Sequence, residues 1–231
     1  MSKGFDNLQI NHHLDLALPF NEAVGAVAFD RSTHQYPFAL HGAPTWVTLA
    51  SGLSVLDFDP ANPDWLDCAG AVTVDLDYTS ENFSLAAWVN LADLTANRTV
   101  ICRGLLVNDG WYYQVLINGS IILVTNQAAG SQYTSSIAGT VVTGAWALMG
   151  ASRDGATVRF YKNGEECTYS LVGTHIDPLT SARETHIGIY DDETAAPWSH
   201  YMRGLRSWGG RALSRADHKY LFATERHWFD V

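Results

Sequence analysis

The fold class of this chain follows from the stretch Trp111-Tyr-Tyr-Gln-Val-Leu-Ile117, Asn118-Gly119, Ser120-Ile-Ile-Leu-Val-Thr125. Two runs of aromatic and β-branched residues flank an Asn-Gly pair, and such residues favour extended strands. An Asn-Gly pair supplies two positive φ angles, which a type I′ turn needs in order to match the twist of its strands. The stretch therefore predicts an antiparallel β-hairpin with a two-residue turn.

The same alternation of strand and turn residues continues along the chain. Residues 146–152, 157–162 and 166–171 are separated by turn residues and predict a three-stranded meander. Further strands are expected at residues 14–20, 45–49, 53–58, 71–75, 83–90, 99–106, 186–190 and 200–208. About a dozen strands require two packed antiparallel sheets, because one open sheet would leave an apolar face in water.

One helix is expected, close to the C-terminus. Ser214 is a suitable N-cap, and Leu213, Leu221 and Phe222 can form an apolar stripe while the basic residues of this segment face water. The predicted fold class is therefore all-β, a two-sheet antiparallel sandwich with one short C-terminal helix.

Composition and charge indicate a single folded domain. The 231 residues include 8 Trp, 10 Tyr and 9 Phe, which is too aromatic for a disordered chain. The length suits one β-sandwich, so we expect an N-terminal arm at residues 1–13 followed by a single domain at residues 14–231. The 24 acidic against 14 basic side chains, a net charge of −10, argue against nucleic acid and anionic membranes as partners. No apolar run is long enough for membrane insertion.

The cysteines and the N-terminal residues bear on the cellular compartment. Cys68, Cys102 and Cys167 are odd in number and widely spaced, so they predict no disulfide framework and are expected to be small buried residues. The first residues lack the apolar stretch of a cleavable signal sequence. We therefore expect synthesis in the cytoplasm without a signal peptide.

The order of these elements resembles that of the laminin-G-like, concanavalin A-like lectin and glucanase jelly rolls. The stretch Asn82-Phe-Ser-Leu-Ala-Ala-Trp-Val89 is similar to a strand typical of that family. Weaker similarities follow in the same order, at residues 16–32, 41–46, 53–58, 146–164 and 203–214. The resemblance covers roughly residues 14–222 and implies a jelly roll. A fold of this kind serves many functions, so function must be argued from the site.

The resemblance also implies a calcium site at the rim of the sandwich, where carboxylates and carbonyls supply hard oxygen ligands. Asp30 matches the early acidic position of the family, whereas Arg206 occupies the late acidic position. Asp191 and Asp192 could supply oxygens to Ca²⁺ instead, or they could form an ordinary solvated acidic loop.

Some relatives of this fold are glycoside hydrolases, which need two carboxylates flanking the scissile bond. The Glu-x-Asp-x-x-Glu arrangement of the β-glucanases is absent. Two acidic alternations, Asp57/Asp59 and Asp75/Asp77, could form catalytic or cation-binding pairs. Asp is also common in turns, and both pairs lie where an expected strand ends. We assign no catalytic residue and expect a non-catalytic protein.

Aromatic rings are the candidate ligand-binding groups, since a flat apolar ring covers one face of a pyranose while neighbouring polar groups bind its hydroxyls. The candidates are Trp65, Trp111, Tyr112 and Trp198. Trp111 and Tyr112 point to opposite faces of one strand, so one of the two faces is core. Trp65 and Trp198 follow prolines in expected loops, where each could be an exposed binding ring or part of a lid folded onto the sandwich.

These observations predict a non-catalytic recognition or structural module with a lectin-like fold. We expect a virion surface component, such as a phage capsid decoration or tail protein, that binds carbohydrate or a host surface. Its expected partners are a structural protein of a larger assembly, glycans and other copies of the chain. The alternatives are a glycoside hydrolase that acts on polysaccharide and a calcium-dependent extracellular adhesion domain.

Overall fold

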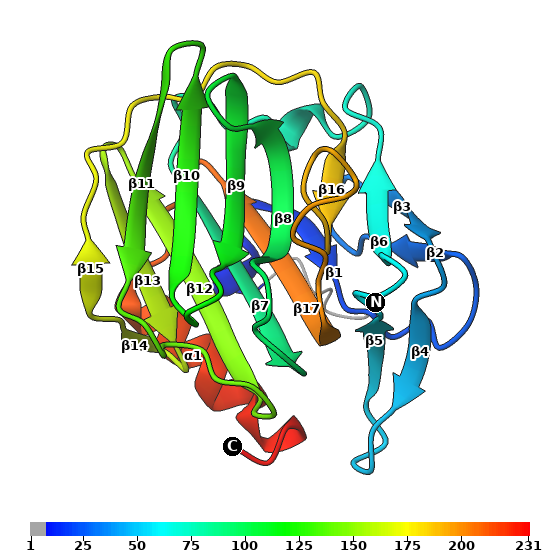
Figure 1. Cartoon of the computed structure of the whole chain (residues 1–231). Coiled ribbons are helices and arrows are strands. Elements are labelled where there is room, and N and C mark those ends of the chain that lie inside the picture. Colours follow the sequence, from blue (N-terminus) through cyan, green and yellow to red (C-terminus); the bar gives the residue numbers. More distant parts are fainter. Residues whose placement is uncertain (1–7) are drawn as a thin grey trace.

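The computed structural model describes residues 8–231, which form two antiparallel sheets packed face to face (Figure 1). Sheet A has the order β14-β13-β12-β7-β17-β5-β4, and β1 pairs with β17. Its strands are β1 (Leu14–Leu18), β4 (Thr45–Thr48), β5 (Ser54–Phe58), β7 (Phe83–Leu91), β12 (Ala147–Asp154), β13 (Thr157–Lys162), β14 (Glu165–Glu166) and β17 (His200–Gly209).

Sheet B has the order β15-β11-β10-β9-β8-β16-β6-β3-β2. Its strands are β2 (Val27–Phe29), β3 (Pro37–His41), β6 (Trp65–Cys68), β8 (Arg98–Leu105), β9 (Asp109–Val115), β10 (Ile121–Gln127), β11 (Gly130–Ser136), β15 (Tyr169–Leu171) and β16 (Thr185–Ile187). The predicted all-β, two-sheet jelly roll with one short C-terminal helix is confirmed.

The strand β7 explains how sheet A can carry a layer on each face. All nine of its residues are buried. Phe83, Leu85 and Val89 face the core between the sheets, whereas Ala86 and Trp88 belong to a second apolar cluster beneath the C-terminal helix. A strand covered on both faces has a nearly continuous apolar sequence, as this one does.

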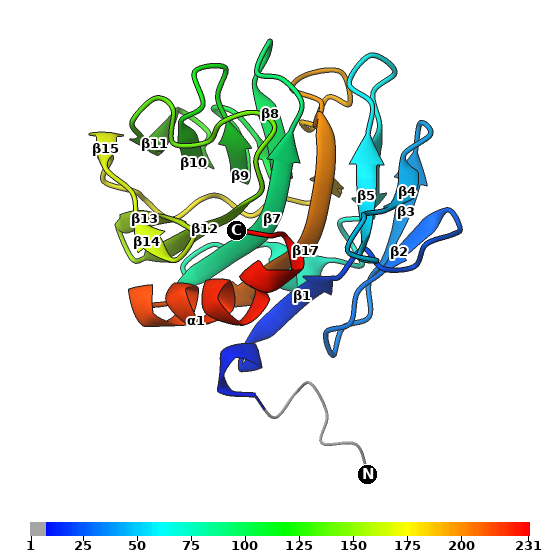
Figure 2. The same cartoon turned by 90° about the horizontal axis from the view of Figure 1, so that it is seen from below.

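The helix α1 (Arg215–Glu225) covers the outer face of sheet A (Figure 2). Ser214 is the N-cap, and it exchanges hydrogen bonds with Asp217 in a capping box. Leu213 and Leu221 are buried against the sheet, as the predicted stripe requires. Within residues 8–231 the other helices are the short 3₁₀ segments η2 (Gln9–Asn11), η3 (Val74–Leu76) and η4 (Arg226–Trp228).

The hairpin that decides the fold class is present as β9 and β10, but the predicted two-residue turn is wrong. Only Gly119 of the Asn-Gly pair has a positive φ, and the loop comprises residues 116–120. The carboxamide oxygen of Asn118 accepts hydrogen bonds from the backbone and hydroxyl of Ser120, which stabilises the longer loop. The downstream pair Asn163-Gly164, with φ of 53° and 79°, has the two positive values of a type I′ turn.

Two other strand predictions are wrong. Residues 71–75 form a turn that leads into η3, in which Leu76 enters the core while Val72 and Val74 remain exposed. The expected third strand of the meander is divided, because β14 pairs with β13 in sheet A whereas β15 pairs with β11 in sheet B. The chain therefore crosses between the sheets near residue 167.

Residues 8–13, which belong to the predicted N-terminal arm, pack against the end of β17. Ile10 is buried, and its carbonyl accepts a hydrogen bond of 2.7 Å from the indole of Trp208. Arg211 donates to the carbonyl of Gln9 at 2.7 Å. The rest of the arm, residues 1–7, lies outside the described residues. Within residues 8–231 no helix is both long and apolar enough to span a membrane.

Candidate functional site

The strand register of sheet B gathers polar and aromatic side chains on its outer face. Tyr112 pairs with Cys102, Cys102 with His186, and His186 with Asp67. Side chains alternate between the faces of a sheet, and directly paired residues share a face. These four residues therefore form one row across β9, β8, β16 and β6, and the residues next to them in sequence face the core.

A cluster of metal-ligating side chains lies at one end of this row. Asp67, Glu184, His186 and Glu193 each offer one ligand atom, and these atoms lie within 4.8 Å of one another. His186 is 3% exposed, and its Nε2 lies 3.5 Å from a carboxylate oxygen of Glu193 and 3.9 Å from one of Glu184. No other group of three or more such side chains is found in the described part of the chain. We call these four residues the His186 cluster.

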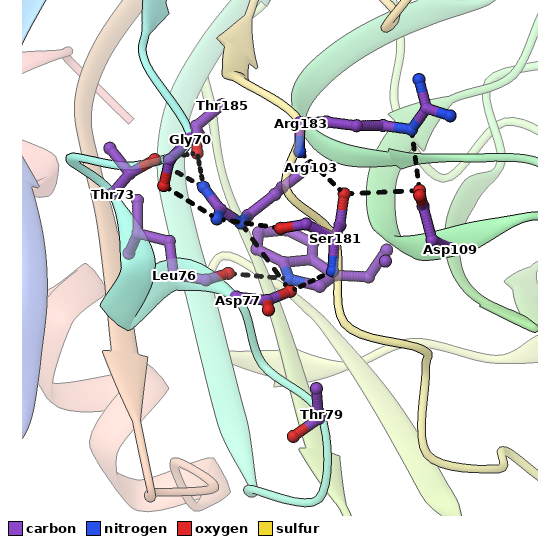
Figure 3. A network of polar contacts seen from close by, with 12 residues as sticks. Gly70, Thr73, Leu76, Asp77, Thr79, Arg103, Asp109, Ser181, Arg183 and Thr185 are labelled. Carbon is purple, nitrogen blue, oxygen red and sulfur yellow. Dashed lines mark hydrogen bonds and ion pairs between the residues drawn. The ribbon is translucent and has the colours of Figure 1, made fainter.

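A buried arginine holds the segments that lead into the His186 cluster (Figure 3). Arg103 of β8 donates to the carbonyls of Gly70 at 3.1 Å and Ser181 at 3.0 Å, and to the hydroxyls of Thr73 and Thr185. Burial lowers the pKa of Arg103, and the nearby carboxylate of Asp77 opposes this shift. Because the guanidinium has so many partners on these segments, it fixes the start of β16 and with it the position of Glu184 and His186.

The predicted calcium ligands Asp191 and Asp192 lie in the loop between β16 and β17, and each has hydrogen-bond or ion-pair partners within the protein. The guanidinium of Arg183 lies 2.7 Å from Asp191 and 2.8 Å from Asp109. Burial raises the pKa of Asp191, and Arg183 acts against that shift. Asp192 accepts backbone hydrogen bonds from the two residues after Glu193, which closes a turn. Neither carboxylate belongs to the His186 cluster.

The third predicted calcium ligand, Asp30, is also an internal hydrogen-bond acceptor. Its buried carboxylate accepts backbone N–H groups of Ala17 at 2.7 Å, Ser32 at 2.8 Å and Tyr36 at 3.3 Å. This arrangement joins β1 to the turn after β2. The side chain therefore has a structural role in the fold, and it too lies outside the His186 cluster.

The four predicted ligand-binding aromatics divide into two pairs. Trp65 and Tyr112 lie on the outer face of sheet B, and Trp65 belongs to β6, so its expected position in a loop is wrong. Trp111 and Trp198 are fully buried in the core between the sheets, so neither presents its ring to solvent. The indole of Trp111 donates to the carbonyl of Leu76 at 3.0 Å, which anchors η3.

The two outward-facing rings have aromatic neighbours. Trp65 is half-buried and stacks on His41, with ring centroids 5.0 Å apart and an interplanar angle of 10°. His41 in turn places its Nε2 2.8 Å from Asp67. Tyr112 is 7% exposed because Tyr190 covers it edge-on at 5.1 Å. Of the four, Trp65 is the ring with the most solvent contact.

The two acidic alternations considered as catalytic pairs have local partners in the structure. Those partners are His200 for Asp57, the backbone N–H of Ala61 for Asp59, the phenol of Tyr36 for Asp75 and the backbone N–H of Ser181 for Asp77. Asp75 lies in η3 and Asp77 follows it, so this second pair does not alternate along a strand as expected. Asp57 thus links β5 to β17, whereas the other three carboxylates stabilise turns and loop contacts.

A concave pocket, which the sequence did not indicate, lies between β1, β17 and the C-terminal segment. Its volume is about 390 Å³. Trp88, Trp228 and Phe229 supply aromatic surface, and Trp228 is 42% exposed. Arg31 and Arg203 are among its polar lining residues. We call this concavity the C-terminal pocket. The one sequence signal that could have indicated it is Trp228, a large aromatic residue in the polar segment that follows the expected helix.

The side chains that line the C-terminal pocket carry a net positive charge, although the protein as a whole is acidic. Arg206 makes two hydrogen bonds of 2.7 Å to Glu225, whose carboxylate also accepts the indole N–H of Trp88 at 2.7 Å. This pair neutralises the lining carboxylate. Arg31 and Arg203 therefore leave the pocket with a local excess of positive charge.

The fold and its sites define a lectin-like jelly roll. A family model described as the concanavalin A-like lectin/glucanases superfamily, of laminin G type, matches residues 68–217. The chain thus belongs to this superfamily, and the suspected resemblance is confirmed. A comparison with curated proteins found no match.

Solved structures with a similar fold include binding domains of botulinum neurotoxins. The binding domain of neurotoxin DC in complex with rat synaptotagmin II gives a TM-score of 0.71 at 13% identity, over 94% of this chain and 52% of that chain. The serotype C1 binding domain gives 0.69 at 12% identity, over 94% and 53%. This chain thus spans about half the length of these neighbours. Identities this low establish similarity of fold alone.

Proposed function

We propose that the protein is a non-catalytic recognition module that binds an anionic glycan in the C-terminal pocket. The observation that carries this proposal is the exposed Trp228 ring, which lines the same concavity as Arg31 and Asn21. Sugar sites commonly combine one flat apolar surface with a few convergent polar groups.

The chemistry of the pocket suits a sugar that carries a carboxylate or sulfate. The exposed ring of Trp228 can cover the apolar face of a pyranose, while the exposed Asn21 and Arg31 can donate to its oxygens. Arg31 lies with its guanidinium 5.9 Å from the ring centre of Phe29. A guanidinium can bind a planar anion with two parallel hydrogen bonds.

Similar structures support binding as a role for this fold. One neurotoxin DC binding domain, with a TM-score of 0.67 at 13% identity, is in complex with SialylT. A structure of the type C toxin is described with the dependence of its cell entry on two ganglioside molecules. These ligands belong to those proteins, and they motivate the choice of acidic glycans as probes here.

The test is a binding measurement on a panel of neutral, sialylated, uronic-acid and sulfated oligosaccharides. We expect acidic glycans to bind. Arg31→Ala should weaken binding about tenfold or more, because a hydrogen bond to a charged group contributes about 1.5–3 kcal/mol. Trp228→Ala should also weaken binding, because the apolar surface that covers the sugar ring is lost. The controls Tyr220→Ala and Arg226→Ala change an exposed aromatic residue and an exposed arginine outside the pocket.

Two results would contradict the proposal. One is the absence of acidic-glycan binding by the unaltered protein, and the other is binding that both pocket variants retain. Trp65→Ala serves as a further arm, because loss of binding in that variant alone would place the site on the ring stack of sheet B.

The cellular setting is a separate proposal. We propose display on a virion surface, as a capsid decoration or tail protein that contacts a structural partner or other copies of the chain. Mass spectrometry of purified particles tests it: the chain should be present in stoichiometric amounts. Recovery only as a soluble monomer that never associates with particles would refute it.

A further inference from the structure

We propose that the His186 cluster is a binding site for a divalent first-row transition-metal ion, with Zn²⁺ as the reference ion. The ligands would be the imidazole of His186 and the carboxylates of Asp67, Glu184 and Glu193, whose nearest atoms already lie within 4.8 Å of one another. The site lies on sheet B and is separate from the predicted calcium ligands and from the C-terminal pocket.

The buried imidazole of His186 is the first argument for a ligand. The residue is 3% exposed, and neither ring nitrogen has a hydrogen-bond partner within the described residues. A buried polar atom left without a partner costs about 1–3 kcal/mol, so native structures rarely leave one in this state. The Nε2 atom points at carboxylate oxygens that are 3.5 and 3.9 Å away, beyond ordinary hydrogen-bond length. A cation between these groups would bind Nε2 together with the carboxylate oxygens, which leaves Nδ1 as the one ring nitrogen without a partner.

The charge balance is the second argument. Three carboxylates converge on the imidazole of His186, and the second imidazole in contact with them, that of His41, lies beside Asp67. Like charges at such short range raise the free energy of the fully ionised state. A divalent cation removes most of this repulsion.

The geometry combines fixed and adjustable ligands. His186 and Asp67 are directly paired across β16 and β6, so their positions are set by the sheet. The side chains of Glu184 and Glu193 are 49% and 46% exposed and can adjust. Ligands about 2.0–2.2 Å from a tetrahedral metal ion lie roughly 3.3–3.6 Å apart, so the two exposed glutamates complete the site by moving inward.

The ligand set favours a transition metal over calcium. Ca²⁺ and Mg²⁺ prefer oxygen ligands alone, whereas an imidazole with carboxylates suits Zn²⁺ and its neighbours. His41 lies 2.8 Å from Asp67 and could orient that carboxylate from outside the metal, as second-layer residues commonly do. Since Glu193 belongs to the loop that covers Tyr112, a bound ion would also fasten this loop to the sheet.

The test is a titration of the whole metal-depleted chain with Zn²⁺, Co²⁺, Ca²⁺ and Mg²⁺ by calorimetry. Visible absorption reports Co²⁺ coordination independently. We expect one Zn²⁺ per chain, a Co²⁺ spectrum that Zn²⁺ abolishes, and Ca²⁺ and Mg²⁺ binding at least 100-fold weaker. His186→Asn and Glu193→Gln should each weaken Zn²⁺ binding more than about tenfold, and His41→Asn by about tenfold. The controls His227→Asn and Glu166→Gln, both on exposed side chains, should leave it unchanged.

Three results would overturn the inference. These are the absence of stoichiometric Zn²⁺ binding, affinity that survives both cluster variants, and preferential binding of Ca²⁺. Glu193 lies on the surface, so Glu193→Gln should fold even if His186→Asn does not. Circular dichroism shows whether each variant is folded. Glycan binding uses the C-terminal pocket, so either proposal can fail without the other.

Discussion

We expect the buried histidine of α1 to make the stability of this protein fall in mild acid. His218 is 1% exposed; its ring stacks on Tyr161 at 4.0 Å, and its Nε2 lies 3.0 Å from the hydroxyl of Ser152. A Cβ at Gly150 would lie 2.5 Å from this ring, so only glycine leaves room for it. Burial lowers the pKa of His218 to about 3, and neighbouring Asp217 opposes the shift only in part.

The magnitude follows from the difference between folded and unfolded states. In the unfolded chain a histidine has a pKa of about 6.5, so at pH 7 the residue is neutral in both states. Between about pH 6.5 and 3 the unfolded chain binds a proton that the folded chain does not, and the free energy of unfolding falls by about 1.4 kcal/mol per pH unit. At about pH 4.5 the loss from His218 alone is therefore roughly 3 kcal/mol.

The variant His218→Gln isolates this contribution, because glutamine does not titrate. We expect the variant to be less stable than the unaltered protein at pH 7, where it lacks the ring contacts. We call the difference in the free energy of unfolding, unaltered protein minus variant, the stability gap. At about pH 4.5 this gap should be smaller than at pH 7 by roughly 3 kcal/mol. Burial also lowers the pKa of His175, to about 4, but this group is present in both proteins and cancels from the comparison.

Urea unfolding followed by tryptophan fluorescence at the two pH values measures the gap. His227→Gln, a change of an exposed histidine, is the control and should show the same gap at both values. A His218→Gln gap that is equal at both pH values would refute the account, since it would mean that the buried ring accepts a proton without cost.

Two further predictions concern stability. Arg103→Leu leaves the carbonyls of Gly70 and Ser181 without their donor and should lower the free energy of unfolding by about 3 kcal/mol, measured by urea unfolding; unchanged stability would show that these loops do not depend on the arginine. Ser214→Ala removes the hydroxyl of the capping box and should cost about 1 kcal/mol, a fall of about 2–4 °C in the thermal midpoint. An equal midpoint for Ser214→Ala would contradict the role of the cap.

Local sequence was sufficient for elements whose signal lies within a few residues. The apolar run at 83–90 predicted β7, and Ser214 with the apolar stripe of Leu221 and Phe222 predicted α1. The same signals failed where a distant contact competed with them. Residues 71–75 alternate like a strand, yet the segment forms a turn and η3, held by Arg103 from another strand.

The aromatic candidates also show which features local sequence predicts and which depend on distant contacts. Alternation correctly placed Trp111 and Tyr112 on opposite faces, but it could not tell which face is core. That choice depends on which sheet packs above the strand. The structure places Trp111 inside and Tyr112 under the loop that carries Tyr190.

The sequence alone determined an all-β, two-sheet sandwich with a capped C-terminal helix, because strand alternation, turn residues and the cap are local properties, and the family resemblance added the jelly-roll topology. The tertiary structure alone decided which side chains meet. Asp67 and His186 share a face only through the register of β6 and β16, and Trp228 and Arg31 line one pocket only because the C-terminal segment returns to β1. A shift of one residue in a strand reverses the face of every side chain, so both sites depend on long-range pairing that no local pattern encodes.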